Sequence, residues 1–238
     1  MDPLALLVYL GGTLLTVALF YSVAIRKSRP VYETSEGIRS KRIESGSIFR
    51  LAAGVAGAVG ILLAVVQSFS SAGLDLLGFA TVSLTAMVTF LLVVFSYTDH
   101  SYRMADRVLL RWGFGMAIIL GVLRLIELQS ESTTVLYAVG ILLSFAIMFV
   151  PSIGASDARS FMLLFAVGIP VLGVLYTYYA FLVGIGLWLA YGIVAAIATR
   201  SFKVSIPLVP YILLPLAIGP IVLSLVYGVP RILEVLSP

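Results

Sequence analysis

The sequence contains no cysteine and a single histidine, His100, among its 238 residues. Disulfides, cysteine-zinc sites and thiol nucleophiles are therefore excluded, and one histidine cannot form a histidine-rich metal site alone. Charge is also scarce, because Lys, Arg, Asp and Glu make up 11% of the chain while 61% is hydrophobic. A water-soluble domain cannot cover its surface with so few charges. The composition therefore predicts an all-α, polytopic membrane protein.

Long apolar runs separated by polar breaks predict about eight transmembrane helices. We place them near residues 4–25, 50–69, 75–97, 107–126, 133–150, 158–178, 180–199 and 206–227. The break between the sixth and seventh helices is the least marked, because only Pro170, Gly173 and the Tyr176–Tyr179 belt indicate a turn. We expect two N-terminal helices in residues 1–74 and a six-helix core in residues 75–238.

Basic residues gather in alternate breaks of this pattern and predict the orientation. The breaks after the first, third, fifth and seventh helices carry most of the arginines and lysines. The positive-inside rule makes these breaks cytoplasmic, so both termini are expected outside. The net charge of +4 then indicates cytoplasmic loops rather than nucleic-acid binding. The loop at 26–49 is too short for a domain, and we interpret it as a basic, mobile linker that touches anionic lipid heads.

Two aspartates stand at predicted helix ends on this cytoplasmic side. Asp99 follows the span 75–97, and Asp157 directly precedes the span 158–178. Two carboxylates brought close together share one proton, and the ionised one then serves as a base that activates water against a peptide carbonyl. The simpler interpretation is that Asp157 only caps its helix and that Asp99 is a solvated interfacial acid.

The residues around both aspartates resemble a known family. The segment IGASDARSFMLL at 153–164 is similar to the GxGD-type motif of prepilin peptidases, including the archaeal preflagellin peptidases. The segment FSYTDHSYRMADRVL at 95–109 resembles the family's first-aspartate region. The segment KVSIPLVPYILLPLAIGP at 203–220 resembles the start of its last helix. The three segments occur in the family's order within residues 75–227.

The resemblance implies an aspartic endopeptidase of the cytoplasmic membrane, with its active site near the cytoplasmic face. Its substrates would be the leader peptides of type IV pilin-like or archaellin precursors. Asp99 and Asp157 would be the catalytic acids, and Asp106 is the other candidate for the first acid, although its place before 107–126 favours a helix cap. The residues that would shape the site or bind substrate are Gly154, Ala155, Ser156 and Arg159.

The same resemblance also implies which cofactors and partners the protein would need. No metal and no organic cofactor would be required, and the partners would be precursor proteins and membrane lipids. The bifunctional bacterial members add a large cytoplasmic segment, often with paired cysteines, and also N-methylate the product. Because the corresponding loop here is short and the chain has no cysteine, we expect peptidase activity without methyltransferase activity.

Departures from the family pattern leave another function open. Ser156 stands where glycine is usual, the span from Asp99 to Asp106 is one residue shorter than usual, and Ala105 replaces a proline, whereas Arg159 in place of the usual lysine keeps the charge. Because of Ser156 and the short spacing, a catalytically silent homologue that acts as an assembly scaffold is one alternative. A proton-coupled transporter is the other, because intramembrane acids also serve carriers. Carriers, however, place such groups near the membrane midplane, whereas both aspartates here are predicted at helix ends.

Overall fold

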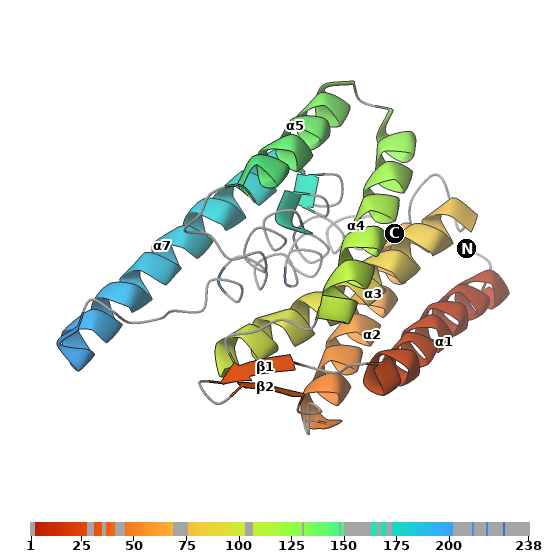
Figure 1. The fold of residues 1–238 in the computed structure, drawn as a ribbon. Helices are drawn as coiled ribbons and strands as arrows, with labels where there is room; N and C mark the ends of the chain where they lie inside the picture. The colour runs from red at the N-terminus through yellow and green to blue at the C-terminus, as the bar shows by residue number, and fades with distance from the viewer. Residues whose placement is uncertain are drawn as a thin grey trace.

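Helices built from long apolar runs dominate the computed structural model (Figure 1). It describes residues 3–27, 31–34, 37–40, 46–68, 76–102, 107–129, 131–147, 149, 163–165, 168–169, 173–201, 211, 218 and 226. Its helices are α1 (Pro3–Lys27), α2 (Gly46–Ser68), α3 (Leu76–Tyr102), α4 (Arg107–Leu128), α5 (Glu131–Ile147) and α7 (Val174–Thr199). Four of these helices, α1, α2, α3 and α7, are long and apolar enough to cross a membrane, whereas the apolar stretches of α4 and α5 are shorter.

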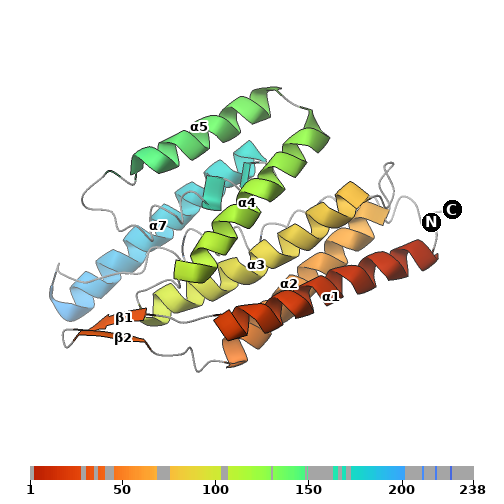
Figure 2. The same cartoon turned by 45° about the vertical axis from the view of Figure 1, so that its right-hand side comes forward.

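A short hairpin occupies part of the basic loop that follows α1. Strand β1 (Val31–Thr34) pairs antiparallel with β2 (Gly37–Ser40), and the register joins Val31 to Ser40 and Thr34 to Gly37. The interpretation of this loop as a linker without structure is corrected for these eight residues. The physical reason is local, because the β-branched and aromatic residues of β1 favour an extended backbone. The hairpin lies at the end of the bundle where α1 and α3 end (Figures 1 and 2).

Helix α3 is the centre of the packing. Helices α1 to α5 run in alternating directions (Figure 2), and α3 contacts α1, α2 and α4. The ring of Phe90 on α3 lies 5.6 Å from that of Phe20 on α1 and 5.8 Å from that of Phe49 on α2. Because α3 is covered on several sides, it is the most buried of the four long helices.

The predicted break before α7 is present at Gly173. It therefore precedes the Tyr176–Tyr179 belt, the other sequence feature that indicates a turn. Gly173 has a φ of +88°, a conformation that glycine adopts without strain, and α7 then runs unbroken from Val174 to Thr199. A turn between 178 and 180 is therefore wrong, and the tyrosines at 176–179 lie in the first two turns of the helix. Gly173 alone supplies the backbone freedom that the turn needs.

The other predicted boundaries differ by a few residues. Helix α3 continues to Tyr102, five residues beyond the predicted end of its span, and α2 begins at Gly46 rather than at 50. The predicted span 206–227 lies almost wholly outside the described residues. The helical architecture is thus established, whereas the count of eight helices remains a prediction.

Candidate active site at the end of α3

Asp99 lies in the last turn of α3, and its residue surface is only 6% exposed. The interpretation of Asp99 as a solvated interfacial acid is therefore wrong. The apolar span of α3 ends at this residue, but the helix continues for three more residues and keeps the carboxylate inside the bundle. A carboxylate is opposed by the dipole at a helix C-terminus. Burial at such a position is costly, which makes Asp99 a candidate for function rather than for stability.

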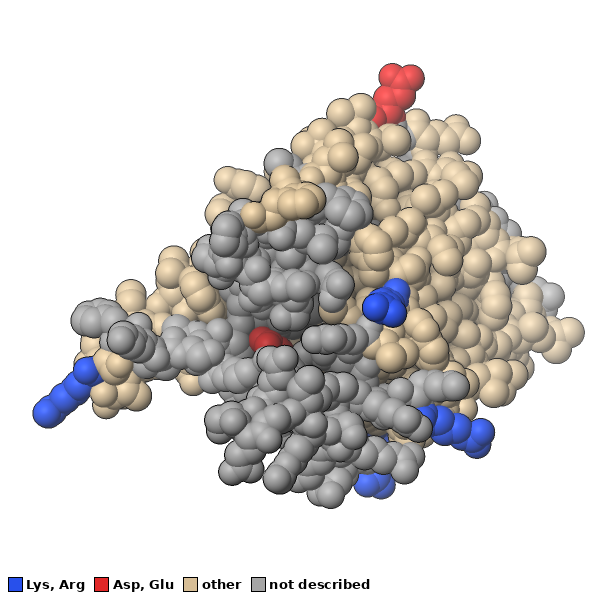
Figure 3. All heavy atoms as spheres, viewed as in Figure 1, with Lys and Arg blue, Asp and Glu red and all other residues tan. Residues whose placement is uncertain are grey.

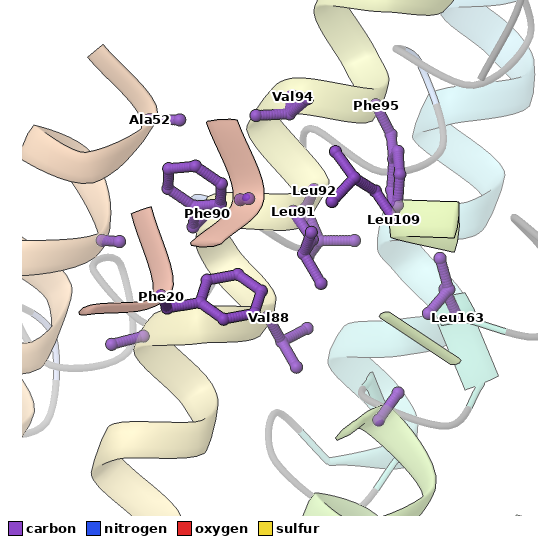
Figure 4. Packing of buried hydrophobic residues seen from close by; sticks show 14 of the residues in the cluster. Phe20, Ala52, Val88, Phe90, Leu91, Leu92, Val94, Phe95, Leu109 and Leu163 are labelled. Atoms are coloured by element: carbon purple, nitrogen blue, oxygen red, sulfur yellow. The ribbon is translucent and has the colours of Figure 1, made fainter. Parts of the chain in front are cut away.

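The helical repeat places Asp99 on one particular side of α3. Residues three, four and seven apart share a helix face, so Asp99 lies on the side of Ser96, Phe95 and Leu92. Phe90 is nine residues away and therefore points to the opposite side. Figure 4 shows Phe90 directed towards Phe20 and Ala52, while Leu91 and Phe95 lie on the side of Leu109. Asp99 thus faces away from the packing of α3 against α1 and α2.

Ser96 is a second polar side chain on this face. It is 6% exposed, and its hydroxyl oxygen is buried without a hydrogen-bond partner in the part of the chain that the structure describes. Thr85 and Thr98 of α3, in contrast, donate to the backbone of their own helix, Thr98 to the carbonyl of Phe95 at 3.2 Å. Sequence reasoning missed Ser96, because a serine one turn before an acid is not distinctive until its unpaired hydroxyl is seen.

The chain that follows Asp157 in sequence reaches the same side of the bundle. Leu163 and Leu164 are fully buried and belong to one hydrophobic cluster with Leu92, Phe95 and Leu109. Figure 4 shows Leu163 on the Leu109 side of α3, opposite Phe20. The packing therefore connects the end of α3, the start of α4 and a segment more than fifty residues further along the chain.

Close contacts of small residues identify the neighbours of this segment. A Cβ atom built at Gly121 of α4 would lie 2.9 Å from the ring of Tyr137 on α5, and one built at Gly140 would lie 3.1 Å from Phe165. Phe165 therefore packs against α5, which in turn packs against α4.

Contacts with α7 give the direction of the described residues of this segment. A Cβ atom built at Gly168 would lie 2.5 Å from Oγ1 of Thr177, and the rings of Phe165 and Phe181 are 6.3 Å apart. The pairs 168–177 and 165–181 are those of two antiparallel stretches on either side of Gly173. Since α7 ends at Thr199 on the side where α3 ends (Figures 1 and 2), Phe165 lies nearer to that side than Gly168 does.

The remaining predicted site residues lie outside the described residues. These are Asp106, Gly154, Ala155, Ser156, Asp157 and Arg159. The side chain of His100 also lies outside them. Tyr97 is exposed and stands two residues from Asp99, which places it on another face of α3. Among the described residues no three side chains of the metal-binding types gather.

Charge is sparse on the described surface. Figure 3 shows uncharged side chains over most of the described part of one face, with basic side chains that stand apart from one another. Such a surface suits contact with lipid rather than water. The described fold thus contains four apolar helices that could cross a membrane, with a buried carboxylate at the end of the apolar span of α3. No protein-family model, no curated protein and no solved structure matches this chain significantly.

Proposed function

We propose that this protein is a membrane aspartic endopeptidase of the prepilin-peptidase type, in which Asp99 and Asp157 form the catalytic pair. One observation carries the proposal: Asp99 is buried on the face of α3 that shares a hydrophobic cluster with Leu163, six residues after Asp157. The resemblance of the sequence around both aspartates to this family supports the same assignment.

Helix geometry supports the proposal that Asp99 and Asp157 lie at the same level along the bundle. The predicted helix that begins at 158 would carry Asp157 about 9 Å beyond Leu163, at 1.5 Å per residue. Asp99 lies about 6 Å beyond Phe95 in the same direction along α3. Because Leu163 and Phe95 belong to one cluster, both carboxylates would lie one to two turns beyond it, at the same end of the bundle.

The proposed reaction is hydrolysis of a peptide bond by a carboxylate pair that shares one proton. The ionised carboxylate takes a proton from water while the water oxygen forms a bond with the carbonyl carbon. The protonated carboxyl donates its proton to the carbonyl oxygen and a tetrahedral intermediate results. The C–N bond then breaks, the amine takes a proton from the first carboxyl, and a hydroxyl of the intermediate returns a proton to the second carboxylate as the new carboxyl product forms. The pair is then back in its starting state, and the atoms of the water are divided between the two products, so no cofactor is consumed.

The motif around Asp157 has a part in the proposal as well. Gly154, Ala155 and Ser156 are small, so a substrate backbone can approach closely. Arg159 would hold the pair partly ionised or position the substrate backbone. The substrate would be a leader with a short basic stretch before an apolar helix, as in pilin-like or archaellin precursors. In the proposed topology eight helices cross the cytoplasmic membrane, both termini lie outside, and the pair lies near the cytoplasmic face.

The position of Asp99 favours a peptidase over a carrier. An ion-coupling acid is expected near the membrane midplane, often at a broken helix. Asp99 instead marks the end of the apolar span of α3, whose helix is continuous from Leu76 to Tyr102. A buried acid at this depth can meet a substrate that enters from the membrane surface.

Disulfide trapping tests the proposed pairing without any substrate. The natural chain has no cysteine, so the double variant Asp99→Cys/Asp157→Cys introduces the only two thiols. A disulfide requires Cα atoms within about 7 Å, and we expect rapid cross-linking under mild oxidation. The matched control is Tyr97→Cys/Asp157→Cys, in which the first thiol starts from another face of α3. Equal cross-linking of both pairs, or of neither, contradicts the proposed site.

Cleavage of a synthetic precursor tests the chemistry. The probe is a peptide with a short basic leader followed by an apolar helix of about 20 residues, reconstituted with the full chain in lipid vesicles. We expect Asp99→Asn and Asp157→Asn each to lower cleavage by about a hundredfold or more, the scale of general acid–base catalysis. Unchanged cleavage in either variant removes the two-aspartate mechanism. Cross-linking without cleavage of precursors by the unaltered chain would instead identify a silent homologue.

A further inference from the structure

A groove between α1 and α4 lies on the outside of the bundle. It has a volume of about 650 Å³ and is lined by α1 from Thr16 to Val23, by α4 from Arg111 to Ile119, and by Met87 of α3. Leu19 and Ile119 are exposed beside it, whereas Phe20 is buried. The volume is within the usual range for small-molecule sites, although nothing in the proposed peptidase reaction uses it.

The lining of the groove suits a hydrocarbon chain. Its one hydroxyl, that of Thr16, donates to the carbonyl of Gly12 at 2.8 Å and is therefore occupied. Met87 and Met116 are flexible side chains that adapt to irregular apolar ligands. A Cβ atom built at Gly115 would meet no atom within 4 Å, so the missing side chain keeps this part of the groove open.

Two arginines stand at one end of the groove. The rings of Phe20 and Trp112 lie 6.3 Å apart, which brings the last part of α1 beside the first part of α4. Arg111 precedes Trp112 and lines the groove, while Arg26 lies two turns after Leu19 on the same side of α1. Both arginines are exposed, and neither forms an ion pair with a residue that the structure describes. One end of an otherwise apolar groove thus carries two positive charges.

We propose that this groove binds an anionic glycerophospholipid, with an acyl chain along α1 and α4 and the phosphate between Arg26 and Arg111. Charge complementarity selects this occupant. A zwitterionic lipid gains less from two arginines, and a substrate segment that begins with a basic leader is repelled by them. Basic pockets between membrane helices on the cytoplasmic side are known sites for anionic head groups. The inference requires a membrane but does not depend on peptidase activity.

Tryptophan fluorescence provides a direct test, because the chain has two tryptophans and Trp112 lines the groove. The indole nitrogen of Trp188 is buried without a partner, so Trp188→Phe removes the other emitter without breaking a hydrogen bond. This full-length variant is reconstituted in phosphatidylcholine vesicles that contain a small fraction of brominated phosphatidylglycerol or brominated phosphatidylcholine. Bromine quenches at short range, so Trp112 is quenched most strongly when a brominated chain lies in the groove.

We expect brominated phosphatidylglycerol to be preferred about 25-fold over brominated phosphatidylcholine, since each arginine near the membrane surface contributes roughly fivefold. Arg26→Gln and Arg111→Gln should each lower the preference about fivefold. The matched control Arg200→Gln removes an exposed arginine at the end of α7 and should leave the preference unchanged.

A second pair of variants tests the groove itself. Gly115→Leu fills it and should abolish quenching by both lipids, whereas Gly186→Leu on α7, where a Cβ atom also meets nothing within 4 Å, should not. Equal quenching by the two lipids in the unaltered groove overturns the proposal. So does the absence of quenching by either lipid, which would mean that a protein surface, such as a second copy of this chain, covers the groove.

Discussion

Ser96 and Asp99 lie one helical turn apart on the same face of α3, and each is only 6% exposed. The Ser96 hydroxyl has no hydrogen-bond partner, although an unmade hydrogen bond in a buried position costs about 1–3 kcal/mol. A hydroxyl that costs stability beside a candidate catalytic acid suggests a role that begins when water or substrate arrives. It can then donate to the Asp99 carboxylate or hold the attacking water.

Ser96→Ala should separate this role from a structural one. We expect the variant to cleave a synthetic precursor about tenfold more slowly, because hydrogen bonds to charged groups contribute about 1.5–3 kcal/mol. Its thermal stability in detergent should stay equal or rise, since the unpaired hydroxyl is gone. Ser83 of α3 is the matched control, as its hydroxyl is also buried and unpaired. Ser83→Ala should leave cleavage unchanged. Slower cleavage in both variants would show a general effect of α3 packing.

Asp106 should be distinguishable from Asp99 by the type of substitution it tolerates. Asp106 directly precedes α4, which begins at Arg107, and aspartate and asparagine are equally good at the position before a helix. Asp106→Asn should therefore keep both cleavage and stability. Asp106→Ala should lose about 1 kcal/mol of stability while cleavage persists. If Asp106→Asn abolishes cleavage and Asp99→Asn does not, Asp106 is the first catalytic acid.

Gly168 should be intolerant of any side chain. A Cβ atom at this position would lie 2.5 Å from Oγ1 and 2.7 Å from Cγ2 of Thr177. Gly168→Ala should therefore lower stability by about 1–3 kcal/mol, the usual cost of overpacking. Adding Thr177→Ala removes both clashing atoms and should restore most of the lost stability.

The control is Gly186→Ala, where the new methyl group meets nothing. It should be neutral or stabilising by about 1 kcal/mol. Thermal unfolding in detergent measures all four chains, and failure of the double variant to recover would place the constraint elsewhere.

Truncation of Leu163 should affect both the stability of the protein and the cross-linking between positions 99 and 157. This side chain is fully buried in the cluster that contains Leu92, Phe95 and Leu109, so Leu163→Ala should cost about 2–5 kcal/mol. Under the proposed pairing, Leu163 anchors the segment that carries Asp157, so cross-linking between cysteines at 99 and 157 should also slow. Leu189→Ala removes an exposed side chain of α7 and should change neither quantity. Normal cross-linking in a destabilised Leu163→Ala chain would show that this contact does not position the second acid.

The sequence predicts long helices well and their ends less well. Apolar runs of membrane length identify α1, α2, α3 and α7, because about twenty consecutive apolar residues are what a span of the hydrocarbon core requires. The apolar run of α3 predicts an end near residue 97, since Asp99 and His100 are polar, yet the helix continues to Tyr102. Polarity therefore indicates where a span ends, not where a helix ends. The turn before α7 is predicted correctly at Gly173 and wrongly at the tyrosines, because a tyrosine favoured at an interface can still lie inside a continuous helix.

The acids of the candidate site are predictable from the sequence, but their surroundings are not. Asp99 is notable from sequence alone, because an acid at the end of an apolar span is rare. Its burial is a property of the packing around the end of α3, which residue order does not show. Ser96 carries no sequence signal by itself, because serine is common in helices of this composition. Only its lack of a hydrogen-bond partner distinguishes it, and that requires coordinates.

The burial of α3 also bears on how the chain is made. This helix carries buried hydroxyls along its length, among them Thr81, Thr85 and Thr89, which are better accommodated by protein than by lipid. Its partners α1 and α2 precede it in the chain, so both have left the ribosome when α3 is delivered to the membrane. Because of this order, α1 and α2 can already provide a surface on which α3 packs when α3 inserts into the membrane. A chain permuted to begin at α3 would insert this helix without that surface and should depend more heavily on the insertion machinery.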